Sequence, residues 1–211
     1  MPDPYIISIP YGTHRAHSPI CDLLNFYAVT IAAIRARPEY AQIGTKMRFT
    51  CASADTDLVY DFKDMIDHIV DGDRPNFVYF EAYSPIAPDL NGGTIEAVRA
   101  PAEHLAAAVF SFFVEPAVDW IKRHVTSDYH RFPPIANFAR VVRNALVHGG
   151  TVNINNPNSA TVSWRGRTYG HAQHGQKILN TGTGLSTGHL IFLMLELSDE
   201  LDALGAPLNL F

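Results

Sequence analysis

The 211-residue sequence predicts a mostly α-helical fold, a bundle of four to five helices with one small β-hairpin inserted near residues 151–164. Apolar residues recur at helical spacing in segments bounded by proline, glycine or N-capping side chains. One pair of β-prone runs surrounds a turn rich in Asn, Pro and Ser. No internal repeat or linker marks a boundary, so we expect a single domain over residues 1–211.

The N-terminal half contains two of the expected helices. The first spans residues 19–37, where Ser18 serves as the N-cap and Pro38 ends the helix. The second spans residues 57–70, is capped by Asp55 and carries an apolar stripe. Both patterns are typical of helices that bury one face.

Three segments of this half do not follow a helical pattern. Residues 1–17 form an N-terminal arm, in which 5–10 are either a short strand or extended chain. Residues 46–52 are either a short strand or a loop. Residues 76–93 are rich in aromatic residues, Pro and Gly, and we interpret them as an irregular excursion whose rings pack into the core.

The C-terminal half begins with a long helix over residues 101–125, which Pro116 is expected to kink or split. A further helix opens at the two prolines 133–134 and ends at the two glycines 149–150. Residues 151–167 then hold the hairpin, with 151–154 and 160–164 as its two strands. The last helix is capped by residue 186 or 187.

Charge is segregated along the sequence. The net charge is −5, yet residues 129–195 contain six basic residues and no acidic residue, whereas residues 1–128 contain 10 basic and 17 acidic residues. Five of the ten histidines also lie in 129–195. This asymmetry favours an anionic partner for the basic stretch. Alternatively, acidic side chains from elsewhere in the fold neutralise it.

Composition excludes several classes of protein. An apolar content of 47% and a charged content of 18% exclude general disorder. Two cysteines, Cys21 and Cys51, are too few for a disulfide framework and fit buried thiols in a reducing compartment. The first ten residues do not resemble a signal peptide and no run approaches 18 apolar residues, so we expect a cytoplasmic protein that does not enter a membrane.

The most informative segment is the helix that ends at residues 149–150. Arg140, Asn144 and His148 are four residues apart and share one face, and Arg143 flanks it. Arginine matches phosphate oxygens, and a histidine near a helix C-terminus suits proton transfer near neutral pH. The spacing therefore indicates a phosphodiester site and disfavours a metal site. Alternatively, these side chains only cap the helix carbonyls.

The six residues Arg143-Asn144-Ala145-Leu146-Val147-His148 resemble the R-x4-H signature of HEPN-domain proteins. The resemblance extends loosely over residues 18–205. It implies a helical bundle that forms a homodimer in which two copies of the motif face each other. It also implies a metal-independent endoribonuclease without a cofactor, acting as a toxin or defence effector. The alternative is a non-catalytic HEPN-fold module that binds RNA or protein.

The resemblance also assigns roles within the motif. Arg143 would hold the scissile phosphate, Asn144 would orient the phosphate or the imidazole, and His148 would act as general base or general acid. Cleavage by the ribose 2′-hydroxyl uses both an acid and a base, so the second imidazole would come from the other subunit. The products would be a 2′,3′-cyclic phosphate and a 5′-hydroxyl.

Four other basic residues are candidate RNA-binding groups. Arg140 lies one turn before the motif, and Arg165 and Arg167 lie beside aromatic residues that can stack on bases. Lys177 follows in the same acid-free stretch. Alternatively, the two hairpin arginines only solubilise an exposed strand edge.

The remaining motifs are less specific. The His-x2-His pairs at 14–17 and 171–174 lack nearby acidic or Cys co-ligands, so we expect no metal site. Residues 180–188 lack the lysine of a P-loop, although a helix N-terminus there suits a phosphate. The acidic run at 61–73 is either a solvated face or a surface for a basic antitoxin protein.

Overall fold

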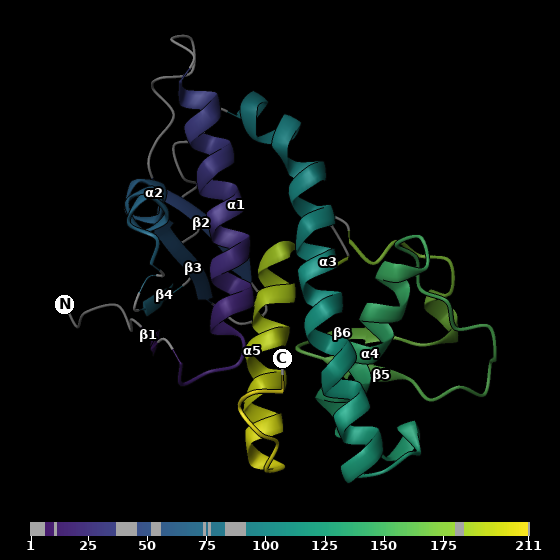
Figure 1. Ribbon diagram of the computed structural model, residues 1–211. Coiled ribbons are helices and arrows are strands. Elements are labelled where there is room, and N and C mark those ends of the chain that lie inside the picture. The colour runs from purple at the N-terminus through teal and green to yellow at the C-terminus, as the bar shows by residue number, and fades with distance from the viewer. Residues whose placement is uncertain are drawn as a thin grey trace. The chain divides into compact units, whose positions relative to one another are not determined.

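The computed structural model describes residues 7–10, 12–36, 46–51, 56–73, 75, 77–82, 92–179 and 184–210. These residues form five α-helices and one small two-stranded antiparallel hairpin, which confirms the mostly helical prediction, together with a separate sheet (Figure 1). The chain divides into two compact units, Met1–Ala106 and Ala107–Phe211.

The helices of the first unit are α1 (His17–Arg35) and α2 (Phe62–Asp71), which contact each other. The predicted apolar stripe of α1 is buried at Ile20, Leu23 and Leu24. The predicted end of this helix at residue 37 lies outside the described residues, and Ser18 is not its N-cap, because the helix already begins at His17. The second helix begins at Phe62, so the predicted cap at Asp55 and the predicted first turn at 57–61, which is a strand, are wrong.

An antiparallel sheet of four strands, in the order β1-β4-β3-β2, corrects the prediction for this unit. The strand alternatives at 5–10 and 46–52 are the ones that form, and part of the predicted irregular excursion is a strand. Of the rest of that excursion, 76 and 83–91 lie outside the described residues, and 92–93 begin a helix. Pairing such as Ile7 opposite Phe80 joins distant segments, which a local pattern cannot reveal. The strands are β1 (Ile7–Pro10), β2 (Lys46–Cys51), β3 (Thr56–Asp61) and β4 (Phe77–Ala82).

The second unit contains the C-terminal part of α3, two further helices, a hairpin and two 3-10 turns. Of the two predicted effects of Pro116, the split does not occur, because α3 is continuous through this residue. Phe112, whose carbonyl loses its helical donor to Pro116, lies on the exposed side where water can bond the carbonyl. The elements are α3 (Gly92–His124), η3 (Tyr129–Arg131), α4 (Pro134–Val147), β5 (Val162–Trp164), β6 (Arg167–Tyr169), η4 (His171–Gln173) and α5 (Thr187–Ala203).

The hairpin has a different partner strand from the predicted one. β5 pairs with β6 across Arg165 and Gly166, whose φ angles of 44° and 76° suit a two-residue turn with the twist of the strands. The predicted first strand instead pairs with residues 175–178, where the Val152 N–H donates to the Gln176 carbonyl at 2.8 Å. A non-local pairing therefore replaces the expected local one.

α4 begins and ends as predicted. Pro133 is its N-cap residue, and Gly149 and Gly150 have φ angles of 89° and 75° that end the helix. Phe138 of α4 is fully buried, and its ring lies 5.4 Å from that of Tyr169 on β6. This packing holds the hairpin under the apolar face of α4 and leaves the other face available.

One segment among the described residues, Glu103–His124 of α3, is long and apolar enough to cross a membrane by length and composition alone. Its mean hydropathy is 1.3. Core helices of folded domains meet the same criterion, and Phe110, Phe113 and Ile121 of this segment are buried. The finding by itself assigns no membrane.

Candidate functional site

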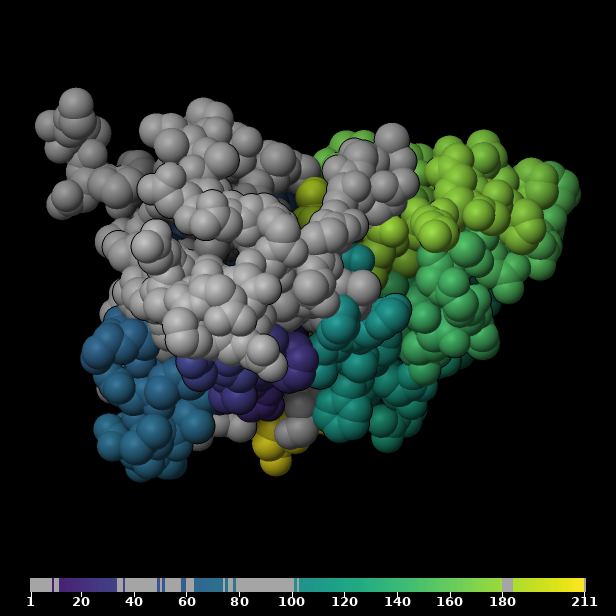
Figure 2. All heavy atoms as spheres, turned by 90° about the horizontal axis from the view of Figure 1, so that it is seen from above, coloured from purple at the N-terminus to yellow at the C-terminus, as the bar shows by residue number. Residues whose placement is uncertain are grey.

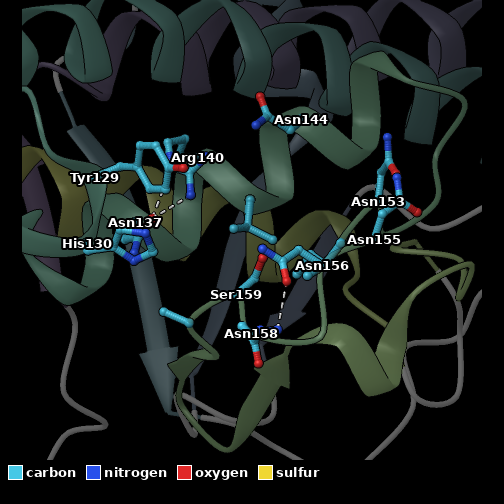
Figure 3. Close-up of a pocket in the computed structure, with 13 residues that line it drawn as sticks. Tyr129, His130, Asn137, Arg140, Asn144, Asn153, Asn155, Asn156, Asn158 and Ser159 are labelled. Carbon is cyan, nitrogen blue, oxygen red and sulfur yellow. Dashed lines mark hydrogen bonds between the residues drawn. The ribbon is translucent and has the colours of Figure 1, made fainter.

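Two cavities adjoin the polar face of α4, and both lie within the second unit. The first, which we call the asparagine cavity, has a volume of about 320 Å³ and is enclosed by α4, η3 and the loop 153–160 (Figure 3). The second, which we call the Glu115 cavity, has a volume of about 410 Å³ between α3 and α4. Tyr129, Arg140 and Asn144 line both.

Arg140 is held in place by neutral groups. Its Nε and Nη2 both donate to Oδ1 of Asn137, at 3.0 and 2.9 Å, and its guanidinium lies 4.5 Å from the centre of the Tyr129 ring. No described residue forms an ion pair with it. Burial lowers the pKa of Arg140, against a smaller opposing effect of Tyr129. Its positive charge is thus partly desolvated and uncompensated, a condition that favours an anionic ligand.

The walls opposite Arg140 come from two short irregular segments. Oδ1 of Asp128 accepts a hydrogen bond from the His130 N–H at 3.0 Å, which starts η3 and places Tyr129 and His130 at the cavity. The loop 153–160 is anchored through Ile154, whose carbonyl lies 2.9 Å from Nδ1 of His171. A hydrogen bond therefore anchors each segment to a residue that does not line the cavity, Asp128 for η3 and His171 for the loop.

The loop 153–160 supplies most of the amide groups. Nδ2 of Asn155 donates to Oδ1 of Asn153 at 2.9 Å, and the Asn158 N–H donates to Oδ1 of Asn156 at 2.9 Å. Figure 3 shows these side chains around the side of the cavity away from Arg140. None of the 13 described residues that line the asparagine cavity is acidic.

The Glu115 cavity has the opposite charge pattern. Nη2 of Arg143 forms an ion pair with Oε2 of Glu115, and Nη1 donates to Oδ1 of Asn144 at 3.3 Å. Asp119 and Lys122 form a second pair at 3.7 Å. The acid-free stretch thus receives a counter-ion from α3 at Arg143, as the alternative interpretation of the charge pattern expected.

His148 lies apart from both cavities. It is the C-cap residue of α4, with φ −110° and ψ 43°, and its N–H donates to the Asn144 carbonyl at 3.2 Å. Its side chain is exposed, yet it lines neither cavity. The structure therefore brings Arg140, Arg143 and Asn144 together and leaves the imidazole at the end of the helix.

Comparison with protein-family models, with curated proteins and with solved structures finds no match for this chain. The resemblance to HEPN-domain proteins thus depends on the six-residue motif and its position at the end of α4.

The remaining predicted RNA-binding residues lie outside the two cavities. Arg165, at the hairpin turn, pairs with Glu196 of α5, which also accepts from Nε1 of Trp164 at 2.8 Å. Arg167 lies on β6, and Lys177 is exposed opposite Thr151. Figure 2 shows yellow-green atoms of this part of the chain at the surface of the face in view.

The two His-x2-His pairs differ in their surroundings. The rings of His171 and His174 stack with centres 6.4 Å apart. Nδ1 of His14 accepts a hydrogen bond from the Ala16 N–H, and His17 is buried beside Cys21. No group of three His, Cys, Asp or Glu side chains in the described part of the chain is arranged to hold a metal ion.

His189 is the most perturbed histidine of the second unit. Burial, with a smaller effect of Arg167, lowers its pKa to about 4. Its Nδ1 accepts from the Ser186 N–H at 3.2 Å, within the predicted cap of α5, and its buried Nε2 has no hydrogen-bond partner in the described residues. The ring is therefore neutral near pH 7 and serves the core.

Sequence reasoning missed Tyr129, His130 and the loop asparagines as lining residues. Two signals were present. The dipeptide Tyr129-His130 is separated by two residues from the prolines that open α4, and four asparagines occur within residues 153–158, after the end of this helix. The segments before and after α4 lie at the same cavity only because the tertiary fold brings them back alongside the helix. The sequence pattern does not show this arrangement.

Proposed function

We propose that this chain binds RNA at the polar face of α4 and cleaves its phosphodiester bonds without a metal ion. The observation that carries the proposal is the position of Arg143 and Asn144, joined by a hydrogen bond, in the last turn of α4, with His148 as the C-cap residue of the same helix. Arg143 holds the phosphate and bears its developing charge, and Asn144 orients the guanidinium through its Oδ1. His148 exchanges the proton of the 2′-hydroxyl or of the leaving 5′-oxygen.

The Glu115–Arg143 ion pair does not block this role. Glu115 is 51% exposed and Arg143 is 27% exposed, so solvent screens their attraction. Exposed ion pairs contribute only about 0.2–1 kcal/mol. A phosphodiester can therefore replace Glu115 at Arg143, and the chain loses only the small interaction energy of this ion pair.

Two copies of the chain complete the proposed site. One chain offers one imidazole at His148, whereas the reaction uses an acid and a base. Two large apolar side chains lie one helical turn from the ion pair, Phe112 at 79% exposure before Glu115 and Val147 at 45% exposure after Arg143. Their burial between two copies would bring the two helix ends together.

Incubation of purified protein with mixed RNA in EDTA tests the proposal. Cleavage by the wild type that is lost in both His148→Ala and Arg143→Ala supports it. His174→Ala is the matched control, because His174 is also exposed and lines neither cavity. Equal cleavage by wild type and His148→Ala would reject the site.

The second candidate function is binding of RNA or protein without catalysis, by a non-catalytic module that resembles the HEPN fold. Two observations favour it: Glu115 neutralises Arg143, and His148 lines neither cavity. RNA binding without cleavage by any variant, in EDTA or in Mg²⁺, would select this function.

A further inference from the structure

We infer that the asparagine cavity binds one nucleotide of a single-stranded RNA, with its phosphate on Arg140 and its base among the loop amides. The inference rests on the proposed function for the class of ligand. It adds a binding site distinct from the proposed reacting groups Arg143 and His148.

The guanidinium of Arg140 is oriented toward a ligand and has no counter-ion among the described residues. Two of its nitrogens are fixed on Asn137, and its ring contact with Tyr129 limits rotation of the guanidinium. Nη1 makes no hydrogen bond to any described residue, and it is not among the buried atoms without a partner, so solvent reaches it. A planar, oriented and uncompensated guanidinium is a good receptor for phosphate oxygens.

The second argument is the composition of the opposite wall. Asn153, Asn155, Asn156 and Asn158 present amide donors and acceptors, and their internal hydrogen bonds use only part of this capacity. Amides pair with the edges of exposed bases through one donor and one acceptor. The cavity contains no acidic side chain that would repel a phosphate.

The volume of the asparagine cavity limits what it can hold. A volume of about 320 Å³ lies at the small end of the range for ligand pockets, about 300–1,000 Å³. This volume suits one nucleotide. A base pair would be too large, so the RNA is single-stranded at this point.

Binding of mononucleotides tests the inference without any cleavage. The probes are the four nucleoside 5′-monophosphates, adenosine, and inorganic phosphate, titrated by calorimetry and by the NMR signal of Arg140 Nε. We expect at least one monophosphate to bind in the micromolar to millimolar range. Adenosine and inorganic phosphate should each bind at least tenfold more weakly than that monophosphate.

Three variants assign the binding to the cavity. Arg140→Gln should weaken the monophosphate about tenfold or more, because a charge-assisted hydrogen bond is lost. Asn155→Ala should weaken it several-fold and reduce the difference among the four bases. Arg131→Gln is the matched control, an exposed arginine of η3 that lines neither cavity, and should change the affinity less than twofold.

Several results would overturn the inference. These are no binding of any monophosphate by the wild type, equal affinity of Arg140→Gln and wild type, and inorganic phosphate binding as tightly as the nucleotides. If Arg140→Gln unfolds, as circular dichroism would show, Arg140→Lys replaces it and should lose at least threefold through loss of the planar fork.

Failure of this inference is distinguishable from failure of the proposed function. RNA cleavage in EDTA without monophosphate binding overturns the nucleotide site and leaves the nuclease proposal intact. Monophosphate binding that depends on Arg140, with no RNA cleavage by the wild type, keeps the nucleotide site and rejects the nuclease.

Discussion

The asparagine cavity and the Glu115 cavity share Tyr129, Arg140 and Asn144 but differ in charge. In the Glu115 cavity Arg143 and Lys122 each have an acidic partner, whereas Arg140, which lines both cavities, has none among the described residues. Two arginines three residues apart on α4 thus have opposite electrostatic surroundings. The difference shows that an excess of basic residues along the sequence stays unneutralised in the fold only where no acidic side chain from another element packs against it.

The largest effect is expected from a substitution in the core beneath α4, the helix that lines both cavities. Phe138→Ala deletes a fully buried ring between α4 and the hairpin and should destabilise the second unit by about 3–5 kcal/mol. Urea unfolding followed by circular dichroism measures it. Val125→Ala, at an exposed position of the same unit, should stay within about 0.5 kcal/mol. Equal losses in the two variants would contradict the packing described.

The two arginines should separate in kinetics. Arg143→Gln removes a group that bears charge in the transition state and should lower kcat for RNA about 10²–10³-fold. Arg140→Gln should raise KM about tenfold and leave kcat nearly unchanged, because Arg140 holds RNA away from the reacting bond. Initial rates over a range of RNA concentrations resolve the two constants. The same loss of kcat in both variants would contradict this separation and would show that the two arginines act in one site.

The comparison needs a pH at which the fold is intact, and His189 sets the lower limit. Its folded pKa of about 4 lies below the value of about 6.5 in an unfolded chain. Its stabilisation is therefore complete above pH 6.5 and is lost progressively between pH 6.5 and 4, by about 2–3 kcal/mol. Unfolding free energies from pH 7.5 to 4.5 measure it, and His189→Gln should flatten this part of the curve. An unchanged slope would contradict the assignment.

The smallest expected effect makes the two cavities more alike. Glu115→Gln releases Arg143 from its counter-ion and should tighten RNA binding by up to about fivefold. Binding to a non-cleavable 2′-O-methyl oligonucleotide at several salt concentrations measures it. Asp119→Asn, which alters the neighbouring pair with Lys122, should have less effect. Weaker binding by Glu115→Gln would show that Glu115 orients Arg143 for RNA.

Sequence reasoning located the helices of the second unit because their boundaries are local. Prolines open α4, glycines with positive φ end it, and Ser186 caps α5, and each acts within one turn of the chain. The apolar stripe of α4, on which the buried Phe138 lies, is likewise a local pattern.

The sheet and the hairpin partner escaped prediction because strand pairing is not local. β1 and β4 are separated by almost 70 residues, and β4 is too rich in adjacent aromatic residues to alternate. The hairpin turn at Arg165-Gly166 is shorter than the Asn-rich turn that attracted attention. The Glu115–Arg143 pair escaped for the same reason, since the acid belongs to another helix.

The central claim is metal-independent cleavage of RNA at the end of α4, and the chemical ends of the products test it most directly. Mass spectrometry of RNA fragments formed in EDTA should find 2′,3′-cyclic phosphates and 5′-hydroxyls with the wild type, and neither with His148→Ala. Intact RNA with the wild type, or fragments that carry 5′-phosphates, would contradict the claim.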